Sequence, residues 1–281
     1  AMDLGPDILA CSGTEIMLDP GLPVNYSYEW SVAGETLPVL SVLSSGSYGL
    51  NATSPEGCEQ SDVIEVTFTE GPAWSQQGSL FFTDIPNAKI HLLSEKSNAL
   101  STFTSESGHA NGILVDASNR ILVCQMDGRV VQYDADTAKY EVLADKYEGK
   151  RFNAPNDLIV DKVGGIYFTD PLFRAPQPLP QGIQAVYYIN PRGKVSRLTD
   201  DIAAPNGIAL SPDGKRLYVI PSRQAEMLVY DVTGPGKIAN GRVLCRLKQP
   251  QGKDNTGGDG MAIDVEGNLY ITTNLGVEIF S

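Results

Sequence analysis

Hydrophobic and polar positions alternate in short runs along this chain, and one arrangement of them occurs five times after residue 69. Each copy opens with a polar residue, runs through mostly apolar positions to a short polar residue five places on, and then leads into a strongly apolar segment. Runs rich in Val, Ile, Leu and Tyr between turn residues predict β-strands, and no segment has the sustained 3.6-residue apolar period of a long helix. The pattern therefore predicts an all-β protein. The opening residues are Glu70, Asn111, Asn156, Asn206 and Asp259.

The copies follow one another at roughly 40 to 50 residues, which is the length of one four-stranded propeller blade. Equivalent positions of a repeat occupy equivalent places around its axis, so the five opening side chains are expected to converge. They offer carboxylate and amide oxygens, the ligands that hard cations prefer. The alternative is that the Asn-Gly and Asp-Gly pairs are hairpin turns and that the two acids are solvated turn residues, which explains five copies in register less well.

Residues 1–68 contain no copy of this repeat, and they are expected to form a separate module of short strands and turns. Cys11 and Cys58 stand near its two ends, which suggests a disulfide if the protein is exported. Cys124 and Cys245 lie in apolar strand segments, where a buried small side chain is a better interpretation than a nucleophile.

Charge and hydropathy exclude several classes of partner. The net charge of −13 over 281 residues disfavours nucleic acid and anionic membranes, which attract basic surfaces. No apolar run has the length that spans a bilayer. The chain begins Ala1-Met2 without a visible signal peptide, and we expect that an export signal has been removed.

The first module resembles the immunoglobulin-like or PKD-like modules of bacterial secreted and surface proteins. The resemblance rests on LGPDILACSGTEIMLDPG, YSYEWS, SSGSYGLNATSPEGC and DVIEVTF. It implies a β-sandwich over residues 1–68 that makes contact with a cell surface or carbohydrate. It also implies a secreted, periplasmic or cell-surface location.

The remainder, residues 69–281, resembles the SMP-30/gluconolactonase family. The matching segments occur in the family's order: FTEGPAW, LFFTDIP, GHANGILVD, YEGKRFNAPNDLIVD, IYFTDP, PNGIALSPDGKRLYV and DGMAIDVEGNLYIT. The resemblance implies a six-bladed β-propeller, with the last blade incomplete because the chain stops at Ser281. It also implies one divalent cation and hydrolysis of sugar lactones.

Carried onto this sequence, the resemblance implies four metal ligands: Glu70, Asn156, Asn206 and Asp259. Asn111 would instead contact the substrate or support the ligands. An oxygen-only set suits calcium or magnesium, and the two histidines, His91 and His109, form no His-rich zinc cluster. Calcium is therefore favoured, with zinc, manganese and magnesium as alternatives.

The expected reaction is hydrolysis in which the cation polarises the lactone carbonyl and Asp259 deprotonates the attacking water. His109 is expected to face the substrate as a proton shuttle or to be a structural residue bonded to a neighbouring carbonyl. Arg151 is expected to bind a sugar acid or hydroxyl or to form a surface ion pair. The Pro-rich loop after Asp170 would roof the site or simply connect two strands. The alternative function is a non-catalytic, metal-containing propeller that binds a small ligand or carbohydrate.

Overall fold

The computed structural model describes residues 2–11, 15–32, 34–43 and 45–281, and no helix occurs among them. None of this described chain could therefore cross a membrane as a helix. The chain divides into two compact units. One comprises Ala1–Glu70 and Asp84–Asn87, and the other comprises Gly71–Thr83 and Ala88–Ser281.

The first unit is built from two small sheets around one apolar core. In the larger sheet β6 lies between β5, which is antiparallel to it, and β1, which is parallel, and β3 pairs with β5. Trp30, Leu50 and Ile64 from this sheet pack with Leu18 and Leu40 from the smaller one. The strands are β1 (Ile8–Cys11), β2 (Ile16–Leu18), β3 (Ser27–Trp30), β4 (Leu40–Val42), β5 (Gly46–Thr53) and β6 (Glu59–Ser75). The immunoglobulin-like or PKD-like identity of this unit stays a prediction.

The register of β1 against β6 shows that the predicted Cys11–Cys58 disulfide is wrong. The backbone of Cys11 lies opposite Thr69, whereas Cys58 immediately precedes Glu59 at the other end of β6. Roughly eleven residues of extended strand span about 35 Å, and a disulfide needs Cα atoms within about 7 Å. Cys58 is accordingly free and exposed, while the side chain of Cys11 lies outside the described residues.

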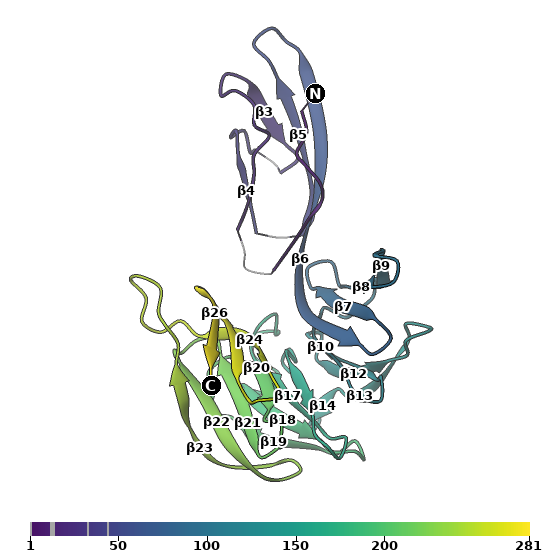
Figure 1. The fold of residues 1–281 in the computed structure, drawn as a ribbon, viewed down its shortest axis with the longest axis vertical. Helices are drawn as coiled ribbons and strands as arrows, with labels where there is room; N and C mark the ends of the chain where they lie inside the picture. Colours follow the sequence, from purple (N-terminus) through teal and green to yellow (C-terminus); the bar gives the residue numbers. More distant parts are fainter. Residues whose placement is uncertain (1, 12–14, 33, 44) are drawn as a thin grey trace. The chain divides into compact units, whose positions relative to one another are not determined.

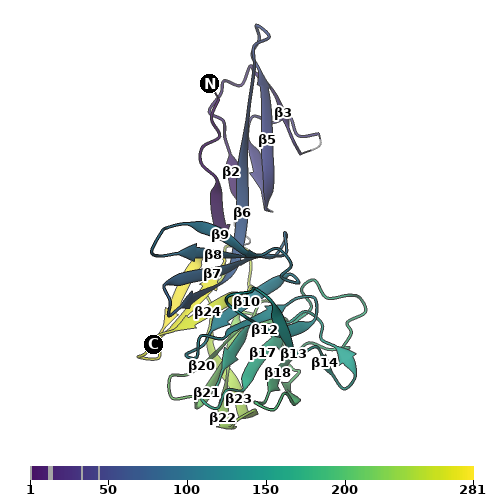
Figure 2. The same ribbon diagram turned by 90° about the vertical axis from the view of Figure 1, so that its right-hand side faces the viewer.

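The second unit consists of five antiparallel sheets that follow one another along the chain, as the colours from blue to yellow show in Figures 1 and 2. The C-terminal part of β6 begins the first sheet, and the fifth sheet has three described strands. The first sheet continues with β7 (Ser79–Asp84), β8 (Lys89–Ser94) and β9 (Leu100–Thr104). The second contains β10 (Ala110–Val115), β11 (Ile121–Gln125), β12 (Arg129–Tyr133) and β13 (Tyr140–Ala144). The hairpin β14 (Lys146–Tyr147) and β15 (Lys150–Arg151) follows it.

The third sheet contains β16 (Leu158–Val160), β17 (Ile166–Asp170), β18 (Ala185–Ile189) and β19 (Val195–Thr199). The fourth contains β20 (Pro205–Leu210), β21 (Arg216–Pro221), β22 (Glu226–Gly234) and β23 (Lys237–Arg246). The fifth contains β24 (Gly258–Ile263), β25 (Leu269–Thr273) and β26 (Gly276–Phe280). The first strands of the later sheets contact one another in the order β10, β16, β20, β24. This succession is the arrangement of propeller blades, and the predicted number of six blades stays a prediction.

The apolar core of the second unit lies between consecutive sheets. A separate cluster of buried residues fills each of the four interfaces, for example Phe168 against Leu122 and Ile220 against Ile271. Cys124 belongs to one cluster, and burial raises the pKa of its thiol well above the usual value. Burial also raises the pKa of the half-buried Cys245 to about 11. Both cysteines thus fit the predicted role of small apolar side chains.

Glycines let the first strands of neighbouring sheets approach closely. A Cβ on Gly112 would lie 2.7 Å from the Asn156 carbonyl oxygen, and one on Gly207 would lie 2.7 Å from that of Asp259. The N–H of Gly112 donates to the same Asn156 oxygen at 2.7 Å. These glycines lie inside β10 and β20, so the hairpin-turn alternative for their Asn-Gly pairs is wrong.

We expect Gly112→Ala to lower the free energy of unfolding by about 1–3 kcal/mol, because the new methyl group must push two backbones apart. Gly260→Ala is the matched control, because Gly260 has the equivalent place in the repeat and its added Cβ would meet nothing nearer than a Thr272 atom at 3.9 Å. Urea unfolding of both variants measures the difference. Equal stability of the two variants would contradict the close approach.

Candidate metal-binding and active site

Asn206 and Asp259 open the fourth and fifth sheets, and their side chains touch. Asn206 Nδ2 donates to Asp259 Oδ1 at 2.6 Å and to the Ser222 hydroxyl at 2.9 Å. Both amide hydrogens are therefore used, and the Asn206 amide oxygen accepts no hydrogen bond from a described residue. Asp259 is open to solvent, yet the protein around it removes enough water to raise its pKa, while the bond from Asn206 lowers it.

Asn156 is joined to this pair through Thr169. The Asn156 N–H donates to the Thr169 carbonyl at 2.9 Å, and the Thr169 hydroxyl donates to the Asn206 carbonyl at 2.8 Å. Asn156 is only 4% exposed, but its carboxamide makes no hydrogen bond with any described residue. The site therefore presents an amide oxygen that is available to a ligand.

Asp157 adds a second carboxylate close to Asp259. It occupies the place that Gly112 and Gly207 have in their repeats, and its carboxylate accepts from the N–H of Ile208 at 3.1 Å and of Leu158 at 2.8 Å. Burial raises the pKa of Asp157 to about 6; the two N–H groups oppose this rise, and the nearby Asp259 adds to it. Burial and a neighbouring carboxylate both disfavour the ionised form of an acid. A positive charge bound here would therefore be stabilised by both carboxylates.

The donor atoms of this cluster fit a hard divalent cation. Asn156 and Asn206 each keep an amide oxygen without a described partner, and Asp259 keeps Oδ2. These are the ligand types of calcium and magnesium. No cluster of three His, Cys, Asp or Glu side chains occurs in the part of the chain that the structure describes. The predicted ligand Glu70 lies on β6 at the end of the first unit, and its role stays a prediction.

The three predicted substrate contacts meet at Met126. Asn111 Nδ2 lies 3.9 Å from Met126 Sδ, the His109 carbonyl accepts the Met126 N–H at 3.1 Å, and Arg151 Nη2 donates to the Met126 carbonyl at 3.4 Å. The backbone bond from Gly112 to the Asn156 carbonyl connects this group to the metal-ligand candidates.

The side chains of His109 and Arg151 do not make the contacts that a purely structural role predicted for them. His109 Nδ1 lies 2.9 Å from Asp127 Oδ1, so the imidazole pairs with a carboxylate instead of a carbonyl. Arg151 donates to the carbonyls of Met126 and Asn153 and makes no ion pair with a described residue. The surface ion-pair alternative for Arg151 is therefore wrong.

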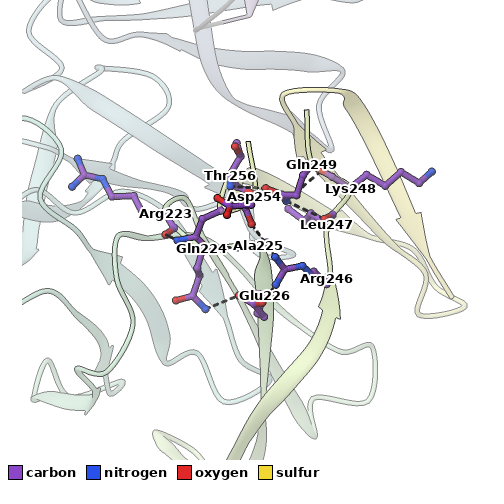
Figure 3. Close-up of polar contacts among 11 residues, drawn as sticks. Arg223, Gln224, Ala225, Glu226, Arg246, Leu247, Lys248, Gln249, Asp254 and Thr256 are labelled. Carbon is purple, nitrogen blue, oxygen red and sulfur yellow. Dashed lines mark hydrogen bonds and ion pairs between the residues drawn. The ribbon is translucent and has the colours of Figure 1, made fainter. Parts of the chain in front are cut away.

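A polar network fixes the loop that leads to Asp259 (Figure 3). Arg246 pairs with Glu226 and donates to the Asp254 carbonyl at 2.8 Å. Gln249 donates to the Thr256 carbonyl at 3.0 Å and accepts its N–H at 2.7 Å. Beyond the loop, Ser222 donates to the Gly258 carbonyl at 3.0 Å. These bonds fix the backbone on both sides of the chain's entry into β24.

Buried Asp170 holds the backbone that precedes Asn156. Its two carboxylate oxygens accept the N–H groups of Asn153 at 2.9 Å and Ala154 at 2.8 Å. Burial raises the pKa of Asp170 to about 7, although these two bonds and the nearby Arg151 lower it. The carboxyl group thus takes part in shaping the segment that carries both Arg151 and Asn156.

Sequence reasoning missed Thr169, Ser222, Met126 and Asp157. One signal was present, because Thr83 in LFFTD and Thr169 in IYFTD share a register. Each donates its hydroxyl to the carbonyl of the next sheet's opening Asn, Thr83 to Asn111 at 3.2 Å and Thr169 to Asn206 at 2.8 Å. Met126 and Ser222 also share a register, because each follows the second strand of its sheet and contacts the Nδ2 of the opening Asn. Their side chains differ in chemistry, so residue type gave no signal for them.

Comparison with known proteins shows which family the second unit resembles. Residues 68–280 match the SMP-30/Gluconolactonase/LRE-like region. A gluconolactonase of Zymomonas mobilis is 31% identical over 240 residues, which are 77% of this chain and 67% of that protein. Regucalcin of Bos taurus is 28% identical over 206 residues, which are 72% of this chain and 67% of that protein. The solved structure of a gluconolactonase from Xanthomonas campestris has a TM-score of 0.69 at 30% identity, covering 76% of this chain and 73% of that one.

The raised pKa of Asp170 predicts a pH dependence of stability. The folded carboxyl keeps its proton up to about pH 7, whereas the unfolded one loses it near 3.8. Its favourable contribution is therefore complete below about pH 4 and is lost as the pH rises to about 7. We expect the free energy of unfolding to fall less steeply over this range in Asp170→Asn, in which Asp157 and Asp259 keep their raised pKa values. Parallel slopes in urea titrations of the two proteins would contradict the prediction.

Proposed function

The chain belongs to the SMP-30/gluconolactonase/LRE-like family, and from this membership we propose that it opens a sugar lactone with the help of one divalent cation. The observation that carries the proposal is the group of three side chains at the head of consecutive sheets. Asn206 is bonded to Asp259, and Asn156 presents an amide oxygen without a described partner. Relatives named gluconolactonase support lactone hydrolysis as the reaction.

Asn156, Asn206 and Asp259 would hold the cation, with Glu70 as the fourth ligand from its register in the repeat. The oxygen-only donor set favours calcium, and magnesium, manganese or zinc are alternatives. When bound, a divalent cation polarises a carbonyl group and stabilises negative charge on its oxygen.

Asp259 is the proposed general base. Oδ2 would bind the cation, and Oδ1, which receives the Asn206 hydrogen bond, would accept a proton from water. The oxygen of that water would bond to the lactone carbonyl carbon, and the ring carbon–oxygen bond would break to give a hydroxy acid.

Asn111, His109 and Arg151 are the proposed substrate contacts. The Asn111 amide and the Arg151 guanidinium contact Met126, and the His109 imidazole pairs with Asp127. Together they are a mixture of donors that suits the hydroxyl and carbonyl oxygens of a sugar lactone. The export of the protein and the contact of its first unit with a cell surface or carbohydrate are further proposals, supported by the sequence resemblance of that unit.

We expect chelator-treated protein to open sugar δ- or γ-lactones only after calcium, magnesium, manganese or zinc is restored. Proton release from the hydroxy acid product measures the rate. Asp259→Asn should reduce kcat at least about 100-fold, because an amide cannot accept the proton. Asp136→Asn is the matched control, since Asp136 is exposed on the turn after β12 and the substitution changes the charge equally.

Two outcomes would overturn parts of this proposal. Stoichiometric metal binding without turnover of any lactone would favour the alternative, a propeller that binds a small ligand or carbohydrate without catalysis. Turnover by Asp259→Asn close to that of Asp136→Asn would leave the lactonase activity standing and refute Asp259 as its base.

A further inference from the structure

Gln181 connects the Pro-rich loop between β17 and β18 to the segment that carries Arg151. Its Nε2 donates to three backbone carbonyls of that segment: Lys150 at 2.8 Å, Arg151 at 3.0 Å and Tyr147 at 3.3 Å. Its own N–H donates to Asn153 Oδ1 at 3.1 Å. Gln181 is 8% exposed, so these bonds are made away from bulk water, where an unpaired carbonyl is costly.

Asn153 continues the connection toward the core. Its Nδ2 donates to the carbonyls of Ile183 at 2.8 Å and Asp170 at 3.2 Å, and its N–H donates to the Asp170 carboxylate. Residues 147–154 are thus held by the loop through Gln181 and by β17 through Asp170. Both attachments act on the backbone of this segment.

The Arg151 side chain extends from this fixed backbone to Met126. Its Nη2 donates to the carbonyls of Met126 at 3.4 Å and Asn153 at 3.3 Å. Gly128 makes room for the guanidinium, because a Cβ at this position would lie 2.5 Å from Arg151 Nε. Nη1 is the terminal nitrogen of Arg151 that has no hydrogen-bond partner among the described residues.

We propose that Gln181 is a positioning residue, which sets the Arg151 guanidinium so that Nη1 can bind an oxygen of the substrate. The inference rests on the proposed lactonase function and deepens it. The Pro-rich loop then influences substrate binding indirectly, through the backbone of the segment that carries Arg151, and not by covering the site. Gln181 itself does not touch the substrate.

The exposed and buried parts of the loop are distinct, which agrees with this proposal. Residues 176–178 at its tip are exposed, whereas Gln181 is buried against the Arg151 segment. Gln184, nearer the loop's end, accepts the Leu172 N–H at 3.1 Å and so closes the loop on itself. Gln184 makes no hydrogen bond to residues 147–154 within the described chain, which makes it a matched control for Gln181.

The test compares Gln181→Leu with Gln184→Leu, both assayed well below their unfolding temperatures with the restored cation. We expect Gln181→Leu to raise KM about tenfold with kcat within about twofold of wild type, because a mobile guanidinium loses binding. We expect the same of Arg151→Ala. Gln184→Leu should leave KM within about twofold. The double variant Gln181→Leu/Arg151→Ala should have the KM of Arg151→Ala alone, because both substitutions remove the same interaction.

The inference is overturned if Gln184→Leu raises KM as much as Gln181→Leu, or if the two effects multiply in the double variant. A role of Gln181 in folding alone would lower the melting temperature and leave KM unchanged. If wild-type protein turns over no lactone, the proposed function fails. Binding of gluconate, a hydroxy acid product, measured by calorimetry in wild type and the four variants, then tests the inference. Equal gluconate affinity in all of them, or binding by none, would reject it.

Discussion

The structure of the second unit depends on how closely the first strands of consecutive sheets approach one another. A Cβ on Gly71 would lie 2.2 Å from the Asn111 carbonyl oxygen, and Gly112 and Gly207 make equivalent contacts with Asn156 and Asp259. Side chains larger than hydrogen would separate the strands at each of these points. Because each glycine immediately follows an opening polar residue, the same contact that joins two sheets also brings their polar side chains together. Packing and site assembly are therefore one constraint in this fold.

That constraint concentrates oxygen atoms with few positive partners. Asn206 and Asp259 share a hydrogen bond, Asn156 keeps an unpaired carboxamide, and Asp157 brings a further carboxylate whose pKa is raised by burial. Apolar side chains in place of this cluster would avoid the free energy needed to remove charged groups from water. A bound cation would offset that free energy.

The repeated arrangement of apolar and polar positions was enough to predict the strands and to place Asn206 and Asp259 in the first strands of their sheets, because a period in sequence implies a period in space. It could not supply contacts that depend on register or on distant loops. The proposed Cys11–Cys58 bridge failed for this reason, since two cysteines near the ends of a segment need not share an end of the sheet. Gln181 was missed because its contacts join residues 30 to 34 positions apart without any repeated spacing. Thr169 lay within the repeat and could have been found.

The Pro-rich loop has an exposed tip and a separate buried residue, Gln181, that attaches it to the rest of the unit. Its tip faces solvent, while Gln181 is anchored inside by hydrogen bonds to the backbone of residues 147–151. Substitutions or insertions at the tip would leave those bonds in place, because the anchor recognises main-chain atoms and not particular side chains. Over evolutionary time such a loop can diverge in length and composition at little cost to the chemistry beside it. Sequence variability in this loop would therefore be a poor guide to whether two relatives handle the same substrates.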